Sequence, residues 1–240
     1  MVLLRLQKFL SQAGACSRRK GEAHILAGDV SVNGQLVTAL GTKVDPESDV
    51  VRLNGVSVGR PAPHVYVMLN KPAGVVSSCD HRGERVVTDL IDLSQRLFPV
   101  GRLDKESTGL LLLTNDGRIH HRLSHPSFDH EKEYEVTVQW PMEADALDAM
   151  RNGVSLSGVM TRPARVTRLS KRRFSIVLKE GRNRQIRRMA KKVGNRVVAL
   201  HRIRVANIKL GKLSNGHWRH LTEDEVRRLL QMLGLQKKVP

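Results

Sequence analysis

The stretch GRLDKESTG, residues 101–109, is followed at once by four leucines at 110–113. A short apolar run bounded by turn residues predicts a buried strand, and the polar segment before it predicts a loop that leads into this strand. The carboxylate of Asp104 has Arg102 and Lys105 close by in sequence, and nearby positive charge keeps a carboxylate ionised. An ionised carboxylate suits a nucleophile better than a general acid. Spacing alone, however, favours an ordinary surface aspartate in a charged turn.

The charge balance of the chain indicates a polyanionic partner. Lys and Arg total 41 against 23 for Asp and Glu, which gives a formal net charge of +18 over 240 residues. Such an excess favours nucleic acid or an anionic membrane as the partner. No apolar run approaches the roughly 20 residues that span a bilayer, so we expect nucleic acid and no membrane association. The length allows two domains.

Signatures of metal and cofactor sites are weak. Cys16 and Cys79 lie far apart in sequence without paired metal-ligand spacing, so we expect a reduced, cytoplasmic environment. His121 and His125 have the i,i+4 spacing of zinc enzymes, but no glutamate completes an H-E-x-x-H motif, and a structural or RNA-facing role is favoured. The sequence has no P-loop and no dinucleotide-type glycine fingerprint. We therefore expect no metal and no cofactor.

The first 28 residues predict two helices. Apolar residues recur at helical spacing over residues 6–13, and Ser17 and Gly28 suit the N-cap and the C-terminal stop of a second helix. Three cations follow Ser17, at a helix end where the dipole disfavours positive charge. They make sense there if side chains and backbone N–H groups together hold a phosphate. A solvated basic face explains them equally well.

Two Asn-Gly pairs, at 33–34 and 54–55, lie between apolar residues of strand type and predict two β-hairpins. Two basic helices followed by small strands resemble the S4 RNA-binding domain, and residues 29–34, DVSVNG, are typical of that family. The resemblance implies that the basic helical face binds structured RNA. The candidate contacts are Arg5, Lys8, Arg18, Arg19 and Lys20.

A linker with two prolines at 60–63 separates this S4 domain, residues 1–59, from a second domain at 64–240. The second domain is expected to begin with a strand at 65–69. The phrase NKPAG at 70–74 follows it and predicts a rigid turn that supports the charged loop described above.

The rest of the second domain alternates strands and helices. Strands are predicted at 131–138, 163–169 and 173–178, and helices at 119–123 and 142–152. Arg202 and Arg204 share one face of a further strand at 197–205, and we expect them to form an RNA surface. Thr222 begins a capping box that opens the last helix.

Residues 180–189, EGRNRQIRRM, begin a helix rich in cations. Its apolar stripe consists of Ile186, Met189, Ala190 and Val193. A like-charge i,i+4 pair costs roughly 0.2–0.5 kcal/mol in an isolated helix. This helix has two such pairs, Arg184 with Arg188 and Arg187 with Lys191. Bound anions would make both tolerable, and Arg187, adjacent to the stripe, is best placed to turn inward.

Several of these segments together resemble the pseudouridine synthases of the RsuA/RluB/RluF branch, which act on ribosomal RNA. The match rests on GRLD at 101–104, STGL at 107–110 and TNDG at 114–117, together with NKPAG at 70–74 and KEYEV at 132–136. It implies an α+β fold, in which a mixed, mostly antiparallel sheet flanked by helices follows the S4 domain. It also implies isomerisation of uridine to pseudouridine without a cofactor.

The resemblance assigns roles to individual residues. Asp104 matches the indispensable loop aspartate, Tyr134 the tyrosine that stacks on the target base, and Arg187 the arginine that pairs with the aspartate. Arg102 matches a side chain that fills the space vacated by the extruded base. The other arginines of this segment are expected to contact phosphates: Arg182, Arg184 and Arg188.

The substrate is suggested by FPVGRLDKES at 98–107 and GHWR at 216–219, which look most like the RluF-type enzymes. We therefore expect a monomer that modifies a uridine in 23S rRNA. The RsuA type, which acts on 16S rRNA, shares most of these motifs and is the first alternative. A non-catalytic S4-type ribosome-assembly factor is the second. It explains the charge, but not why Asp104, Tyr134 and Arg187 each fall within a matching motif.

Overall fold

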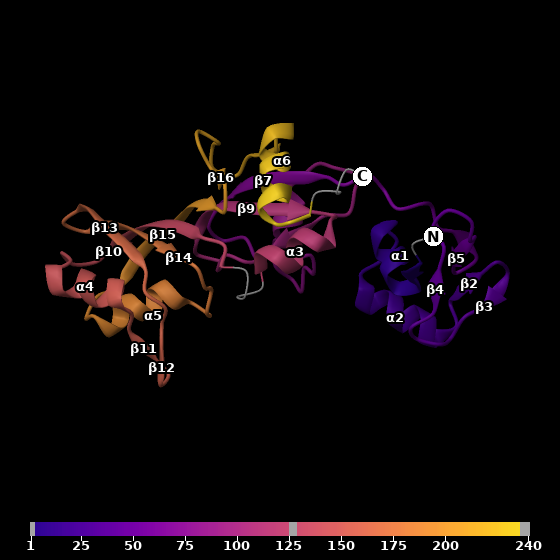
Figure 1. Ribbon diagram of the computed structural model, residues 1–240, viewed down its shortest axis with the longest axis horizontal. Helices are drawn as coiled ribbons and strands as arrows, with labels where there is room; N and C mark the ends of the chain where they lie inside the picture. Colours follow the sequence, from indigo (N-terminus) through magenta and orange to yellow (C-terminus); the bar gives the residue numbers. More distant parts are fainter. Residues whose placement is uncertain (1–2, 125–128, 236–240) are drawn as a thin grey trace. The chain divides into compact units, whose positions relative to one another are not determined.

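The computed structural model describes residues 3–124 and 129–235, which fall into two units (Figure 1). The first contains the described residues up to Val65 together with Leu93–Arg96, and the second contains Tyr66–Asp92 and the described residues from Leu97 onward. No described helix has both the length and the apolar character that a membrane span requires.

Helices α1 (Leu6–Gln12) and α2 (Arg18–Ala27) open the first unit, where the sequence predicts them. The Ser17 hydroxyl accepts a hydrogen bond from the Lys20 backbone N–H at 3.2 Å and so caps α2. Gly28 ends this helix in the left-handed conformation with φ +78°, which residues with a Cβ rarely adopt. Both predicted ends of the helix are confirmed.

Two hairpins form a four-stranded sheet in the first unit, with strand order β3-β2-β5-β6, and β1 pairs separately with β4. Their turns are the two Asn-Gly pairs, in which Asn33 and Asn54 have φ of +53° and +50°. Both predicted hairpins are confirmed, because positive φ at this position is what a two-residue type I′ turn requires. The strands of this unit are β1 (Leu4–Arg5), β2 (Val30–Val32), β3 (Gln35–Leu36), β4 (Lys43–Val44), β5 (Val51–Leu53) and β6 (Val56–Ser57).

A mixed sheet forms the centre of the second unit, with the order β13-β14-β10-β15-β9-β7-β17. In addition, β16 pairs with β15 and β8 with β9. Among the described strands of this sheet, β15 and β9 form a parallel pair, and the other ladders are antiparallel. The predicted α+β fold with a mostly antiparallel sheet is therefore confirmed. Its strands are β7 (Tyr66–Lys71), β8 (Phe98–Val100), β9 (Thr108–Thr114), β10 (Lys132–Val138), β13 (Arg165–Ser170), β14 (Arg173–Leu178), β15 (Val197–Val205), β16 (Ile208–Lys209) and β17 (Trp218–His220).

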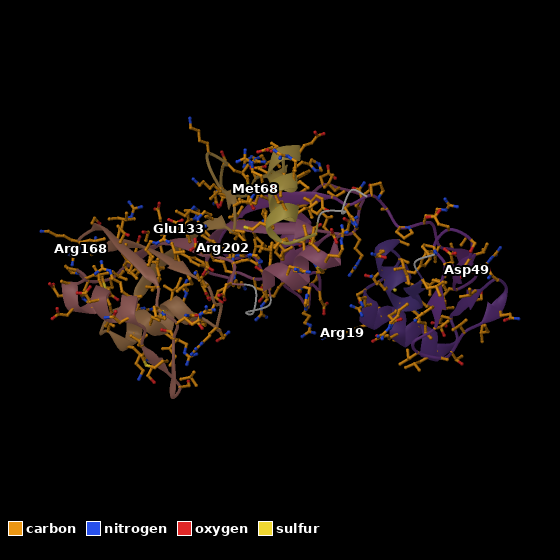
Figure 2. All side chains as sticks on the ribbon, in the orientation of Figure 1. Arg19, Asp49, Met68, Glu133, Arg168 and Arg202 are labelled. Carbon is orange, nitrogen blue, oxygen red and sulfur yellow. The ribbon has the colours of Figure 1, made fainter. Side chains whose placement is uncertain are left out.

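Helices cover this sheet in two places (Figure 1). Helices α4 and α5 pack on β10, β13, β14 and β15 through a core that includes Met150, Phe174 and Met189. Helices α3 and α6 pack with β7 and β9 around Met68, which is labelled in Figure 2, and Leu229. The remaining elements are the 3₁₀ turn η1 (Val87–Leu90), α3 (Gly117–Ser124), α4 (Ala144–Asn152), the hairpin of β11 (Ser155–Leu156) and β12 (Val159–Met160), α5 (Gln185–Lys192) and α6 (Glu223–Met232).

The parallel contact of β9 with β15 positions the loop 101–107, which precedes β9. Gly109 lies opposite Arg202 in this ladder and has φ +104°. A Cβ on Gly109 would lie 2.3 Å from the Arg202 carbonyl oxygen, so only glycine permits the approach. The loop consequently opens toward β10, β15 and the start of α5.

Candidate active site

A hollow of about 190 Å³ lies in the second unit between the loop 101–107, the segment that leads into α5, and side chains of β10, β14 and β15. Its walls combine two carboxylates, Asp104 and Glu180, with one aromatic ring, several cations and apolar side chains. Pockets in which a few polar groups converge on an apolar lining are the usual sites of ligand binding. The polar and ionisable side chains that line it include Arg102, Asp104, Lys132, Tyr134, Arg184 and Arg202.

Asp104 lies at the rim of this hollow, with 29% of its side chain exposed. Two guanidinium groups stand beside its Oδ2 atom, Arg184 Nη1 at 3.6 Å and Arg187 Nε at 3.7 Å. Both distances exceed that of a good hydrogen bond, so the contacts are ion pairs. The carboxylate therefore stays open to a ligand in the hollow.

Arg187 is held in place by the loop and by the neighbouring strand. Its Nη2 donates to Ser107 Oγ at 3.2 Å, and its Nη1 donates to the Val197 carbonyl at 3.4 Å. Met189, on the same helix, is fully buried in the core, which fixes the rotation of α5. The position beside the apolar stripe thus brings Arg187 to Asp104, where the sequence interpretation expects it.

Lys71 holds the loop 101–107 in place through hydrogen bonds to its backbone. This residue is fully buried, and its Nζ donates to the carbonyls of Pro72 at 2.9 Å, Lys105 at 3.3 Å and Ser107 at 2.8 Å. The Ser77 hydroxyl also accepts from the Leu103 N–H and donates to the Leu103 carbonyl. The sequence interpretation gave NKPAG the role of a rigid turn that supports this loop, but it missed that Lys71 itself donates to carbonyls of the loop.

Tyr134 and Lys132 line the hollow from β10, two residues apart and hence on one face of the strand. The guanidinium carbon of Arg202 lies 5.9 Å from the centroid of the Tyr134 ring, within the range of a cation–π contact. Lys132 Nζ donates to the His130 carbonyl at 3.2 Å, and burial, together with the charge of Arg202, lowers the pKa of Lys132. The ring of Tyr134 is thus a flat wall with a cation close to it.

The three arginines expected at phosphates have different surroundings. Arg182 donates to two carbonyl oxygens of the β11–β12 hairpin and to a glutamate, and Arg188 donates to Ser157 of the same hairpin at 2.6 Å. Arg184 instead pairs with two carboxylates of the loop 101–107. Phosphate contacts by Arg182 or Arg188 would therefore have to compete with bonds that already hold the hairpin.

The expectation that Arg202 and Arg204 form an exposed RNA surface is wrong. Arg202 is only 3% exposed, and Arg204 pairs with Glu131 at 2.9 Å and with Glu133 at 2.8 Å. The reason is that β15 lies between β10 and β9 inside the sheet, so its cations contact neighbouring strands (Arg202 and Glu133 are labelled in Figure 2). The two glutamates at alternate positions of the 131–138 segment were a signal for the Arg204 pairing.

In the first unit, all five candidate RNA contacts are exposed on the surface: Arg5, Lys8, Arg18, Arg19 and Lys20. Arg19, labelled in Figure 2, lies in the first turn of α2. Because the Ser17 cap already occupies the N–H of Lys20, an anion there would be held mainly by side chains and the remaining N–H groups.

His121 is exposed on α3, and His125 lies outside the described residues. Within residues 3–124 and 129–235, no group of three or more His, Cys, Asp or Glu side chains is placed to hold a metal ion.

Comparison with known proteins adds an independent observation. The model of the RNA pseudouridylate synthase family matches residues 65–192, and that of the S4 domain matches residues 4–51. The chain is 43% identical over 233 residues to ribosomal large subunit pseudouridine synthase B of Bacillus subtilis, which covers 94% of this chain and 95% of that protein. It is 39% identical over 232 residues to the dual-specificity RNA pseudouridine synthase RluF of Escherichia coli, which covers 96% and 79%.

A solved structure described as a pseudouridylate synthase matches with a TM-score of 0.70 at 32% identity, and the match covers 94% of this chain and 99% of that one. The two family matches, together with the mixed sheet and its carboxylate-lined pocket, place the chain in the class of RNA-modifying enzymes. The chain belongs to the RNA pseudouridylate synthase family, and it is a pseudouridine synthase of the RluF, RluB and RsuA type.

Proposed function

We propose that this isomerase converts one uridine of ribosomal RNA, in 23S rather than 16S rRNA, to pseudouridine, and that Asp104 is its reacting carboxylate. The observation that carries the proposal is the position of Asp104 beside Arg184 and Arg187 at the rim of the hollow, in a chain of this family. The name of the Bacillus relative places the substrate of that protein in the large ribosomal subunit, which favours 23S rRNA here.

The reaction exchanges the N1–C1′ bond of uridine for a C5–C1′ bond, with no net change in atoms or electrons. In one route, an oxygen of Asp104 attacks C1′, the N1–C1′ electron pair leaves with the base, and a ribosyl ester forms. In the other, Asp104 removes the C2′ proton, and the same pair leaves with the base as a glycal forms. In both routes the base then turns and C5 bonds to C1′. In the first route Asp104 leaves C1′ as this bond forms, and in the second Asp104 returns the proton to C2′. The C5 proton is lost and N1 gains one.

The neighbouring side chains have separate tasks in this proposal. Arg187 orients Asp104 and compensates its charge. Tyr134 stacks on the extruded base and takes part in removal of the C5 proton. Arg102, exposed in the loop two residues before Asp104, fills the space that the base leaves in the RNA.

RNA binding is assigned mainly to the first unit. Unstacking a base costs a few kcal/mol, which contacts elsewhere on the RNA must offset. The exposed cations of α1 and α2 supply such contacts by binding phosphates and the shape of folded RNA.

The combined change of Arg18, Arg19 and Lys20 to Ala should weaken RNA binding and leave the rate at saturating RNA unchanged. The logarithm of the binding constant falls linearly with the logarithm of the salt concentration, by about 0.9 for each phosphate that the protein neutralises on duplex-like sites. The loss of three cations should therefore make this slope shallower by roughly 2 to 3. Filter binding at several salt concentrations measures this slope. The matched control is Lys43→Ala, an exposed cation on β4 of the same unit, which should leave it unchanged. Equal slopes for the wild type, the triple variant and Lys43→Ala would contradict a role of these three cations in RNA binding.

Catalysis should decline as the pH rises through about 8, because burial lowers the pKa of Lys71 to about 8, although the charges of Asp104 and Glu106 oppose the shift. The neutral amine has two N–H donors for three carbonyls, so one of these carbonyls is left without its donor. In the unfolded chain Lys71 keeps its ordinary pKa of 10.5. Between pH 8 and 10.5 the unfolded state therefore binds more protons, and this group makes the native state more stable as the pH rises.

A pH–rate profile, with the melting temperature measured over the same range, tests this prediction. Lys71→Met has no titrating amine, so it should be slower throughout but show no decline centred near pH 8. A decline that persists in Lys71→Met, or one that follows thermal unfolding of the wild type, would contradict the assignment.

The substrate is tested with unmodified 23S and 16S rRNA, in which pseudouridine is detected by chemical adduct formation and primer extension. A single modified position in 23S rRNA is the expected result. Modification of 16S rRNA alone would assign the protein to the RsuA type. Binding to either RNA without any modification would instead support a ribosome-assembly factor and contradict the proposal.

A further inference from the structure

Arg202 is a buried cation whose hydrogen bonding is incomplete. Its Nε donates to the Leu110 carbonyl at 2.7 Å, and its Nη1 donates to the Arg102 carbonyl at 3.4 Å. Its Nη2 is buried, has no hydrogen-bond partner among the described residues, and belongs to a side chain that lines the hollow beside Tyr134. An arginine that is 97% buried thus has one N–H₂ group left for a ligand.

The charge of Arg202 is also uncompensated. No ion pair formed by the described residues includes it, and its positive field helps to lower the pKa of both Lys71 and Lys132. Burying a polar group without a partner is unfavourable, and burying a charged one is more so. A ligand in the pocket would remove this unfavourable state if it accepted a hydrogen bond from Arg202 Nη2 and carried negative charge at some stage of the reaction.

The guanidinium is fixed before any ligand arrives. The Arg202 backbone is packed against Gly109 so closely that a Cβ there would clash, and the register of β10 and β15 sets Tyr134 opposite Arg202. A donor held in this way requires no reorganisation when charge develops next to it, and such donors give large rate effects in a site that excludes water.

We propose that Arg202 is a further catalytic residue, which donates from Nη2 to a carbonyl oxygen of the target uracil and stabilises the anionic base that is released when the N1–C1′ bond breaks. This inference rests on the proposed function. In both routes given above, the electron pair of the broken bond leaves with the base and is delocalised over its ring and carbonyl oxygens. The pair that later forms the C5–C1′ bond, together with loss of the C5 proton and protonation of N1, removes this charge again.

A phosphate is the other anion that RNA could offer to Arg202. It is disfavoured because Arg202 lies inside the unit, next to the ring expected to stack on the base, whereas the exposed cations Arg102 and Arg184 stand at the rim. The extruded base is the part of the nucleotide that enters such a pocket, while the backbone stays outside.

The test compares uridine with 5-fluorouridine at the target position of the same RNA, in single turnover with saturating enzyme. Fluorine withdraws electron density, so the detached 5-fluorouracil anion needs less help from the enzyme. Arg202→Lys keeps a positive charge but loses the forked donor. It should slow consumption of the target uridine about 100-fold or more, as removal of one donor to a developing anion does, and that of 5-fluorouridine about 10-fold or less. Nucleoside analysis by mass spectrometry measures both.

The matched control is Arg204→Lys, two residues further along β15, which should leave both rates near those of the wild type. Equal slowing of the two substrates by Arg202→Lys, or no slowing on uridine, would overturn the inference. Circular dichroism establishes that each variant is folded. An inactive wild type would contradict the proposed function itself, whereas an active wild type with an indifferent Arg202→Lys contradicts only the role of Arg202.

If Arg202→Lys does not fold, a crystal structure of the wild-type protein with the 5-fluorouridine RNA decides the question. Nη2 of Arg202 is expected within about 3.2 Å of a carbonyl oxygen of the base. Nη2 bound to a phosphate, or to water with the base elsewhere, would overturn the inference.

Discussion

Replacing Asp104 with Asn should abolish pseudouridine formation, with a fall of at least about 10⁴-fold in the rate at saturating RNA, as loss of a reacting group typically produces. Asparagine has nearly the same shape, but it is neither an anionic nucleophile nor a base for the C2′ proton. RNA affinity should change little, because the side chain stands at the rim of the hollow and most RNA contacts are assigned to other residues. Nucleoside analysis of the treated RNA and filter binding measure the two quantities.

Glu106→Gln is the matched control. Glu106 lies in the same loop and pairs with the same Arg184, at 3.1 Å, but its side chain is 62% exposed and does not line the hollow. Its activity should stay close to that of the wild type. If Asp104→Asn keeps more than a trace of activity, Asp104 is not the reacting group. If both variants fall equally, the loop needs negative charge in general, which also contradicts a specific role of Asp104.

Replacing Arg187 with Met should lower the rate at saturating RNA by roughly 10²- to 10³-fold, the effect of removing one well-placed electrostatic partner from an active site. Arg187 is 15% exposed and is bonded to Ser107 and Val197, so it holds Asp104 in one orientation. The variant should also be less stable, by less than the about 3–5 kcal/mol typical of a fully buried pair, since water reaches Asp104 and screens the charges.

The variant Arg184→Met tests whether Arg187 acts by orienting Asp104 or only by placing a positive charge near it. Arg184 stands as close to Asp104 as Arg187 does, but its side chain is 45% exposed and reaches the loop from solvent. Its replacement should affect RNA affinity more than the rate at saturation. Arg187→Lys, which restores a charge without the two fixed hydrogen bonds, should recover part of the activity that Arg187→Met lacks. Similar rate reductions for Arg184→Met and Arg187→Met would show that any nearby cation suffices.

Local patterns predicted much of this fold. The Ser17 cap, the two Asn-Gly hairpins and the capping box at Thr222 all occur where the sequence places them, because each depends on backbone geometry within a few residues. In the predicted apolar stripe of the 186–193 segment, Ile186, Met189 and Ala190 are buried and Val193 packs partly buried against the same core, since helical periodicity decides which face packs.

Features that depend on distant parts of the chain could not be predicted in this way. The sequence separates Arg202 from Gly109 by 93 positions, and only the parallel contact of β9 and β15 makes that arginine a wall of the pocket. The three carbonyls bound by Lys71 likewise come together only through tertiary packing. A basic residue in a strand was interpreted as exposed, although its position inside the sheet buries it.

The most direct test of the central claim is tritium release from ribosomal RNA labelled at C5 of uridine, measured in single turnover for the wild type and for Asp104→Asn at equal RNA occupancy. The account predicts release of one tritium per RNA by the wild type and none above background by the variant. Release by Asp104→Asn at a rate near that of the wild type would contradict the assignment of Asp104 as the reacting carboxylate.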